Sequence, residues 1–413
     1  RLPMRPTAWA RIRPGAKTLV IGPGGGVDVA RALASGARDV TGVEINPIII
    51  NDIMRGAFAG ASRRLYFRSD VRIHIEDGRT FIRRSREKYQ VIQMTLVDTW
   101  ASIAAGAFAL SENNLYTVEA FAEYFDHLTD DGMLAVTRWE FDPPRESLRV
   151  VSLALEALRR LGVAEPWRHF VIGRENPEGA EGYGALDTVL VKRTPFNPEE
   201  IKQARRFLAE ANTPPVYLPG DWIPNRFTEF LRSEDPEGFM RQYRFDISPV
   251  TDNRPFFFYT VRASDLWSLF VRPRSVDTKI NIGVMMLFVL LGVSLLATAV
   301  ILATPPLLLG ARVPKEPAAL RHLAYFVCLG VGFIMVEVAL IQKFVLFLGQ
   351  PTYALTVVIF TLLIASGVGS YCSQRVIQGE DRRLTIVLSL VVLLVSLLGL
   401  ATPRLLEAGA GLP

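Results

Sequence analysis

Cysteine is scarce in this chain. Its 413 residues include only two cysteines, Cys328 and Cys372, and both fall in apolar segments that we expect to cross a membrane. Two such thiols can build neither a disulfide framework nor a thiolate metal site. We therefore expect no metal centre, and we interpret both cysteines as packing residues.

The chain also lacks a basic stripe interleaved with aromatic side chains, which binding of single-stranded nucleic acid would need. Its net charge is +5. Basic residues gather only just before the first long apolar segment, at Arg262, Arg272, Arg274 and Lys279. Positive charge beside a membrane span favours lipid headgroups. We expect the lipid bilayer as a partner and no nucleic acid.

Charge is almost absent from the last third of the chain. Apolar segments with few or no charged residues cover residues 281–309, 323–348, 353–373 and 384–402. Each can cross a hydrocarbon layer of about 30 Å, which takes about 20 helical residues. We predict a transmembrane helical domain at residues 280–405 with about four spans. Because the chain starts at Arg1 without an initiating methionine, we expect it to continue upstream.

Residues 17–193 alternate short β-branched runs with helical stretches, which predicts an α/β sheet with helices on both faces. We place strands at residues 17–22, 39–44, 72–76, 90–97, 132–138, 167–173 and 186–193, and helices at 27–35, 47–60, 78–86, 117–129 and 145–162. No helical pattern separates the last two strands, so a hairpin there adds one antiparallel strand. This arrangement is typical of the Rossmann-like, seven-stranded methyltransferase-type sheet. We assign it to residues 1–195, and a docking extension with a juxtamembrane linker to residues 196–279.

A glycine-rich turn follows the first predicted strand. It contains Gly22, Gly24 and Gly26, and Glu44 ends the next predicted strand. Glycine lets the backbone turn tightly and approach a ligand, while a carboxylate about 20 residues later can accept hydrogen bonds from ribose hydroxyls. The spacing indicates a nucleotide or nucleoside site, although glycine also serves turn geometry alone.

Asp77 and Gly78 follow the third predicted strand. At the carboxyl end of a parallel strand, Asp77 can accept a hydrogen bond from an exocyclic amine such as that of adenine. Aspartate is equally suited to cap the helix that begins there. Together with the glycine turn and Glu44, this pair favours a nucleoside ligand.

Asp98 ends the fourth predicted strand, on the same edge of the sheet. A carboxylate there would face the reacting end of the ligand, where it could hold a cationic amine or accept its proton. The alternative is a capping or turn aspartate before Thr99 and Trp100.

These motifs resemble the spermidine synthase family of polyamine aminopropyltransferases, in particular its membrane-embedded bacterial relatives. The resemblance rests on residues 22–26, 43–47, 77–79, 89–98, 110–117, 251–257 and 337–348. It implies a fold that binds S-adenosylmethionine or its decarboxylated form as co-substrate, with Glu44 on the ribose and Asp77 near the adenine. It also implies an amine-type small-molecule acceptor, held and deprotonated by acidic side chains.

The chain departs from that family in its amine site. Family members carry an acidic residue inside the glycine turn, where this chain has Gly25, although Asp28 lies three positions later. They carry two aspartates after the fourth strand, of which this chain keeps Asp98 but has Thr95 at the other position. Their amino-terminal β-domain is absent here, and Glu112 or Glu119 are the candidates to replace a missing carboxylate.

Polar residues also occur in the predicted membrane domain, at Glu337, Gln342 and Lys343. A charged group at membrane depth costs about 2.5–3.5 kcal/mol on insertion scales, so such residues are seldom idle. They either form a polar path between spans, or Lys343 snorkels to an interface and Glu337 is neutral.

Three functions remain open. The first is a transferase anchored in the membrane, which the resemblance places in the bacterial inner membrane. A cytoplasmic catalytic domain agrees with the basic cluster, although Arg382 and Arg383 would then lie on the other side. The second is methyl transfer to a lipid-soluble substrate, and the third is a transporter or sensor that binds a nucleoside for regulation only. A homodimer is a further expectation.

Overall fold

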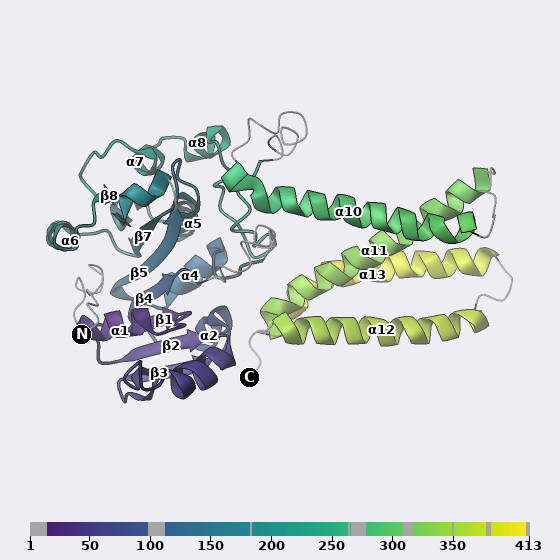
Figure 1. Ribbon diagram of the computed structural model, residues 1–413, viewed down its shortest axis with the longest axis horizontal. Helices are drawn as coiled ribbons and strands as arrows, with labels where there is room; N and C mark the ends of the chain where they lie inside the picture. The colour runs from purple at the N-terminus through teal and green to yellow at the C-terminus, as the bar shows by residue number, and fades with distance from the viewer. Residues whose placement is uncertain are drawn as a thin grey trace. The chain divides into compact units, whose positions relative to one another are not determined.

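The computed structural model describes residues 15–97, 112–181, 184–262, 265, 278–308, 317–348, 351–376 and 381–409. The chain divides into two compact units, Arg1–Thr298 and Ala299–Pro413. The first unit contains the sheet, and the second contains most of the long apolar helices (Figure 1).

The sheet has the strand order β3-β2-β1-β4-β5-β7-β6-β8. Its strands are β1 (Thr18–Ile21), β2 (Val40–Glu44), β3 (Val71–Ile75), β4 (Tyr89–Thr95), β5 (Leu128–Glu140), β6 (Phe170–Glu175), β7 (Ala185–Lys192) and β8 (Pro215–Tyr217). Strands β1 to β5 pair in parallel, whereas β7 pairs antiparallel with both β5 and β6. The predicted hairpin and the methyltransferase-type sheet are therefore confirmed.

One strand was not predicted. β8 pairs antiparallel with β6 through Ile172 and Tyr217, and it adds an eighth strand at the edge of the sheet. Its three residues are too few to show an alternating pattern, which explains why the sequence does not reveal it.

Helices cover both faces of the sheet, as predicted. They are α1 (Val27–Ala34), η1 (Ile49–Ala57, a π-helix), α2 (Gly78–Arg84), α4 (Val118–Asp126) and α5 (Glu146–Arg160). Successive side chains of a strand point to opposite faces, so Val20 packs in the cluster around α1 and η1. Leu19 and Ile21 pack in the larger cluster that contains α4 and α5.

The segment after β7 packs onto the sheet. It contains α6 (Pro198–Glu210), α7 (Arg226–Leu231) and α8 (Pro236–Gln242). Tyr217, Phe230, Phe257 and Phe258 from this segment belong to the same core as strands β1, β4 and β5. Phe257 and Phe258, two of three consecutive phenylalanines, are buried, so this run packs on the sheet-containing part.

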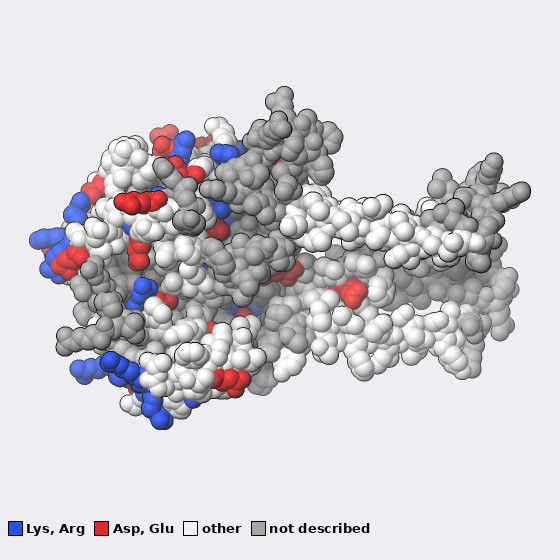
Figure 2. Space-filling view, in the orientation of Figure 1, with Lys and Arg blue, Asp and Glu red and all other residues white. Residues whose placement is uncertain are grey.

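The carboxyl-terminal part contains four long helices, α10 (Thr278–Leu308), α11 (Pro317–Leu348), α12 (Pro351–Val376) and α13 (Asp381–Gly409). Three of their segments are long and apolar enough to cross a membrane, namely Arg321–Val345, Tyr353–Ser373 and Thr385–Thr402. The fourth predicted span lies on α10, whose described apolar stretch Met286–Leu302 is shorter. Figure 2 shows charged side chains spread over the sheet-containing part, while the described surface of the long helices is nearly uncharged.

Polar residues of these helices have varied surroundings. Glu337 and Lys343 are both partly buried on α11, so the choice between a polar path and snorkelling stays a prediction. Cys328 and Cys372 are free and exposed. The two cysteines are therefore not packing residues within the described part of the chain, contrary to our expectation.

Candidate functional site

The carboxyl ends of β1, β2, β3 and β4 meet at one edge of the sheet because these strands are parallel. β1 lies between β2 and β4, so the connections after β1 and β4 leave this edge in opposite directions along the sheet. Ligands of open α/β sheets bind at such a point. The glycine turn follows β1 and therefore lies at this point.

The turn needs glycine for two different reasons. Gly26 caps the amino end of α1 with a φ of 84°, and a Cβ there would lie 2.6 Å from Cδ2 of Leu65. A side chain at this position would be strained and would also clash. At Gly25, in contrast, a Cβ would meet no atom of the described residues within 4 Å. The turn therefore has its packed side at Gly26 and borders open space at Gly25.

Glu44 is fixed beside this turn. Its Oε2 accepts a hydrogen bond from the amide of Gly24 at 3.1 Å, and its Oε1 accepts one from the amide of Asn46 at 3.1 Å. The residue is buried, with 6% of its surface exposed. These two bonds hold the carboxylate at the end of β2, and each oxygen keeps further acceptor capacity.

Tyr66 holds the turn through its hydroxyl, which donates to the carbonyl oxygen of Gly24 at 2.8 Å. Burial raises the pKa of Tyr66, and the nearby charge of Glu44 adds to that shift. The hydroxyl therefore stays protonated and keeps donating. Together, Glu44 and Tyr66 fix both the amide and the carbonyl of Gly24. No pattern in the sequence indicated Tyr66, because it lies outside the strand-end motifs.

Asp77 caps the amino end of α2. Its Oδ1 accepts hydrogen bonds from the amide of Thr80 at 2.9 Å and from the hydroxyl of Thr80 at 3.0 Å. The capping interpretation is therefore correct, and the role of Asp77 toward adenine stays a prediction. Gly78 allows α2 to approach β1, because a Cβ there would lie 2.6 Å from Cγ2 of Ile21.

Asp98 lies outside the described residues. At the described end of β4, the hydroxyl of Thr95 instead lies near the carboxylate of Asp28 of α1 and favours its charged form. Asp28 is 6% exposed, and burial raises its pKa even though Thr95 and Arg31 counteract the shift. A buried carboxylate thus lies between the turn and β4, which the sequence indicated only by the position of Asp28.

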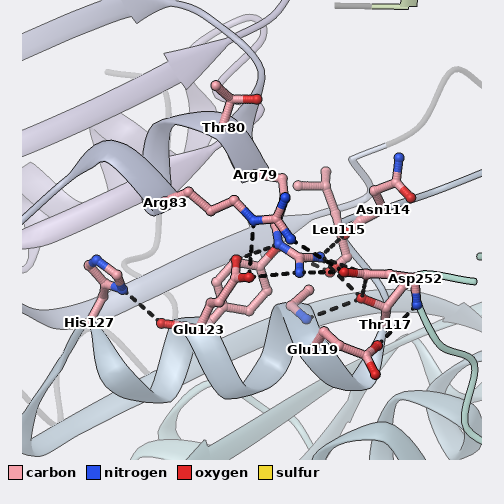
Figure 3. A network of polar contacts seen from close by, with 12 residues as sticks. Arg79, Thr80, Arg83, Asn114, Leu115, Thr117, Glu119, Glu123, His127 and Asp252 are labelled. Atoms are coloured by element: carbon pink, nitrogen blue, oxygen red, sulfur yellow. Dashed lines mark hydrogen bonds and ion pairs between the residues drawn. The ribbon is translucent and has the colours of Figure 1, made fainter. Parts of the chain in front are cut away.

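A buried arginine links α2 to α4 and to the segment after α8 (Figure 3). Arg79 is 1% exposed and forms ion pairs with Glu123 and with Asp252. Its Nη1 also donates to the hydroxyl of Thr117 at 3.1 Å. Arg83 contacts the same two carboxylates from the exposed side, at 3.1 and 3.3 Å. This network fixes α2, and hence Asp77 and Gly78, against the rest of the fold.

Glu119 belongs to the same network. One of its oxygens accepts from the amide of Asp252 at 3.0 Å, and the other pairs with Arg160 at 3.0 Å. The structure therefore gives Glu119 a role in holding residue 252 in place. Glu112, the other candidate replacement, is partly buried and has an interaction of its own.

The chain is similar to solved structures of two kinds. A spermidine synthase in complex with the transition state analogue AdoDATO is 17% identical over 47% of this chain and 62% of that chain, with a TM-score of 0.34. The spermidine synthase from Thermotoga maritima is 19% identical over the same shares, with a TM-score of 0.33. A ribosomal protein L11 methylase from Lactobacillus delbrueckii subsp. bulgaricus is 13% identical over 46% of this chain and 78% of that chain, with a TM-score of 0.29.

The chain thus spans about 62% of the length of the two spermidine synthase structures. No protein-family model matches it, and no curated protein matches it. The methyltransferase-type fold itself follows from the strand order and from the antiparallel β7.

Proposed function

We propose that the chain is a membrane-anchored transferase that uses an adenosyl-sulfonium donor, S-adenosylmethionine or its decarboxylated form. The observation that carries this proposal is the hydrogen bond from the amide of Gly24 to Glu44. It places an acidic side chain and a glycine backbone side by side at the ligand-binding edge, which suits a ribose and the tail attached to it.

The residues at this edge fit an adenosyl group. Both oxygens of Glu44 can accept further hydrogen bonds from ribose hydroxyls, since a carboxylate has about four acceptor positions. The space beside Gly25 leaves room for the tail of the ligand. Ile45 directly follows β2 and is 44% exposed, and Ile75 is the last residue of β3 and is 38% exposed, so both offer an apolar surface to a purine.

The proposed acceptor is a small nucleophile of the amine type. The donor would supply an electrophilic carbon next to its sulfonium sulfur. A protonated amine cannot attack until it loses a proton, so a carboxylate must lie within reach of it. We assign this role to Asp98, which follows the end of β4.

A second candidate is methyl transfer to a lipid-soluble substrate. The observation that favours it is that Thr95 carries no charge, while the nearby carboxylate of Asp28 is buried and pairs with Arg31 at 3.5 Å, which disfavours the binding of a diamine at the described end of β4. Methyl transfer depends more on in-line positioning of donor and acceptor than on a pair of bases. Three apolar helices of membrane-spanning length would bring such a substrate to the protein.

For localisation we propose an inner-membrane protein whose catalytic part faces the cytoplasm. The long apolar helices support an integral membrane protein. The basic residues before α10 support the cytoplasmic side by the positive-inside rule.

The test is calorimetric binding of both donors and of neutral methylthioadenosine to the full-length protein in detergent. We expect the wild type to bind. We expect Glu44→Gln to bind about ten- to a hundredfold more weakly, because a hydrogen bond to a charged carboxylate contributes about 1.5–3 kcal/mol. The matched control is Glu76→Gln, since Glu76 is an acidic residue of the adjacent strand end that pairs with Arg84 at 2.9 Å. Equal affinities in Glu44→Gln and wild type would refute the nucleoside site. A preference for the decarboxylated donor would favour aminopropyl over methyl transfer.

A further inference from the structure

A basic recess lies in the segment that follows α8. Two adjoining cavities of about 280 and 540 Å³ share the lining residues Asp246, Ser248, Arg254 and Tyr259. Arg149 of α5 lines the smaller cavity, and Arg241 and Arg262 line the larger one. The recess thus combines four arginines with a small number of acidic side chains.

Arg149 builds the wall of the recess. Its Nη1 donates to the carbonyl oxygens of Phe257 at 2.6 Å and of Tyr259 at 2.7 Å, and its Nε donates to that of Ser248 at 3.1 Å. The side chain is 1% exposed. Because these bonds run to the backbone, they fix the shape of the segment whatever its side chains are.

The acidic groups of the recess are already engaged. Oδ1 of Asp246 accepts from the amide of Ser248 at 3.0 Å and from its hydroxyl at 2.5 Å, while Oδ2 lies 3.4 Å from Nη2 of Arg149. Glu237 pairs with Arg241 at 3.5 Å. These contacts neutralise Arg149 and Arg241.

The side chains of two arginines of the recess form no ion pair in the part of the chain that the structure describes, although the carboxylate of Asp265 accepts a hydrogen bond from the backbone amide of Arg262 at 3.2 Å. Arg254 is exposed, and only its backbone amide is bonded, to the carbonyl of Thr251 at 2.8 Å. Arg262 donates from Nη2 to two backbone carbonyls, of Met240 and Phe245. Its Nε is buried and has no hydrogen-bond partner among the described residues. A buried donor without a partner is costly, so a ligand oxygen would relieve it.

Arg254 adds positive charge next to Asp246 and Arg149 in the recess. The pKa of Asp246 is lowered in spite of burial, by Arg149 first and by Arg254 in addition. The pKa of Arg149 is lowered to about 10, by burial first and also by the charge of Arg254. An anion beside Arg254 would therefore be attracted, whereas a cation would be repelled.

We propose that this recess is a binding site for the phosphate group of a small organic phosphate or a lipid headgroup, held by Arg254 and Arg262. Planar guanidinium groups present several N–H donors that match phosphate oxygens. Tyr259 lines both cavities, and its hydroxyl adds a donor. The proposal does not depend on the adenosyl site, because none of these residues lies at the carboxyl ends of β1 to β4.

The experiment uses the full-length protein in neutral detergent and in nanodiscs. Inorganic phosphate and glycerol 3-phosphate are titrated by calorimetry, and native mass spectrometry counts bound phosphatidylglycerol against phosphatidylcholine. The variants are Arg254→Gln, Arg262→Gln and Arg254→Lys. The control is Arg226→Gln, since Arg226 is an exposed arginine of α7 that pairs with Glu229 at 2.7 Å. Circular dichroism verifies that each variant is folded.

We expect Arg254→Gln to weaken phosphate binding about tenfold while the control stays within about twofold, and Arg254→Lys to fall between them. Saturable binding of the soluble phosphates identifies a free metabolite as ligand. Retention of phosphatidylglycerol alone identifies a lipid headgroup. Absence of saturable binding to every probe, or equal loss in Arg226→Gln and Arg254→Gln, would overturn the proposal. If Arg262→Gln is unfolded, the phosphate affinities of Arg254→Gln and Arg254→Lys still test the proposal.

Discussion

Arg79 and Asp252 are 173 residues apart in the chain and form a two-point contact, with Nη2 to Oδ2 at 3.0 Å and Nη1 to Oδ1 at 3.2 Å. Arg79 comes directly after Gly78, at the proposed adenosyl site, and Asp252 comes two residues before Arg254, in the phosphate recess. The contact therefore joins the two proposed sites through a single buried guanidinium.

The first prediction concerns the stability of this contact. Arg79→Ala removes the buried partner of two carboxylates, so we expect the free energy of unfolding to fall by about 3–5 kcal/mol. Arg83→Ala is the matched control, because Arg83 contacts the same carboxylates with 32% of its side chain exposed, and we expect a loss below about 1 kcal/mol. Denaturant titration of both variants measures the difference. Equal losses of stability in the two variants would show that the ion pairs of Arg79 are not strengthened by its burial.

The second prediction separates the two sides of the glycine turn. Gly26→Ala places a Cβ 2.6 Å from Leu65 at a φ of 84°, so we expect lower thermal stability. In Gly25→Ala the new methyl enters open space, so we expect nearly unchanged stability and weaker binding of the adenosyl donor. Thermal unfolding and calorimetry on the same samples test this. Full donor affinity in a folded Gly25→Ala would argue against a ligand beside the turn.

The third prediction is a pH dependence of stability. Burial first, and repulsion by Asp187 in addition, raise the pKa of Glu140 from 4.5 to about 8. The folded protein then keeps a proton that the unfolded chain releases, so stability is highest below pH 4.5 and is lost as the pH rises toward 8. The slope from this group is up to about 1.4 kcal/mol per pH unit.

Denaturation midpoints at several pH values in this window measure the slope. We expect Glu140→Gln to flatten the profile, because it removes the titrating group. Glu165→Gln is the control, since Glu165 is an exposed carboxylate paired with Arg168 at 2.9 Å, and it should leave the slope intact. A wild-type protein that grows more stable with rising pH would contradict the assignment.

The fourth prediction tests the membrane spans with the two natural cysteines. Cys328 lies seven residues after the start of the window Arg321–Val345, and Cys372 lies next to the end of Tyr353–Ser373. In sealed vesicles we expect Cys328, studied in Cys372→Ser, to resist a charged maleimide, because the thiolate is disfavoured in hydrocarbon. Cys372, studied in Cys328→Ser, should react faster. Rapid labelling of Cys328 in intact vesicles would show that this part of α11 does not lie in the membrane.

The positions of the strands could be predicted because their signals are local. β1, β2 and β4 are short and largely apolar runs, and Gly26 marks the start of α1. The packing of Phe257 and Phe258 could be predicted from the cost of leaving such side chains in water. Strand β8 could not, because its pairing with Ile172 depends on a tertiary contact.

The site was predictable only where residues follow strand ends. Glu44 could be found by its spacing from the turn, and its hydrogen bond with Gly24 shows that it lies beside the turn, whereas its contact with a ribose stays a prediction. The hydroxyl of Tyr66 and the proximity of Asp28 to Thr95 depend on how distant segments fold together. No spacing rule relates Arg79 to Asp252 or Arg149 to the carbonyl of Tyr259. The sequence therefore does not reveal the side chains that support the sites without lining them.

The bonds from Arg149 to the carbonyls of Phe257 and Tyr259 set a limit on how the gene can be shortened. A fragment that stops after β7 would lack these acceptors, so the guanidinium of Arg149 would lose its hydrogen bonds. It would also expose the aromatic surface that α7 covers. Expression of a water-soluble form should therefore retain the polypeptide at least through Arg262. A shorter product would be expected to collect in inclusion bodies.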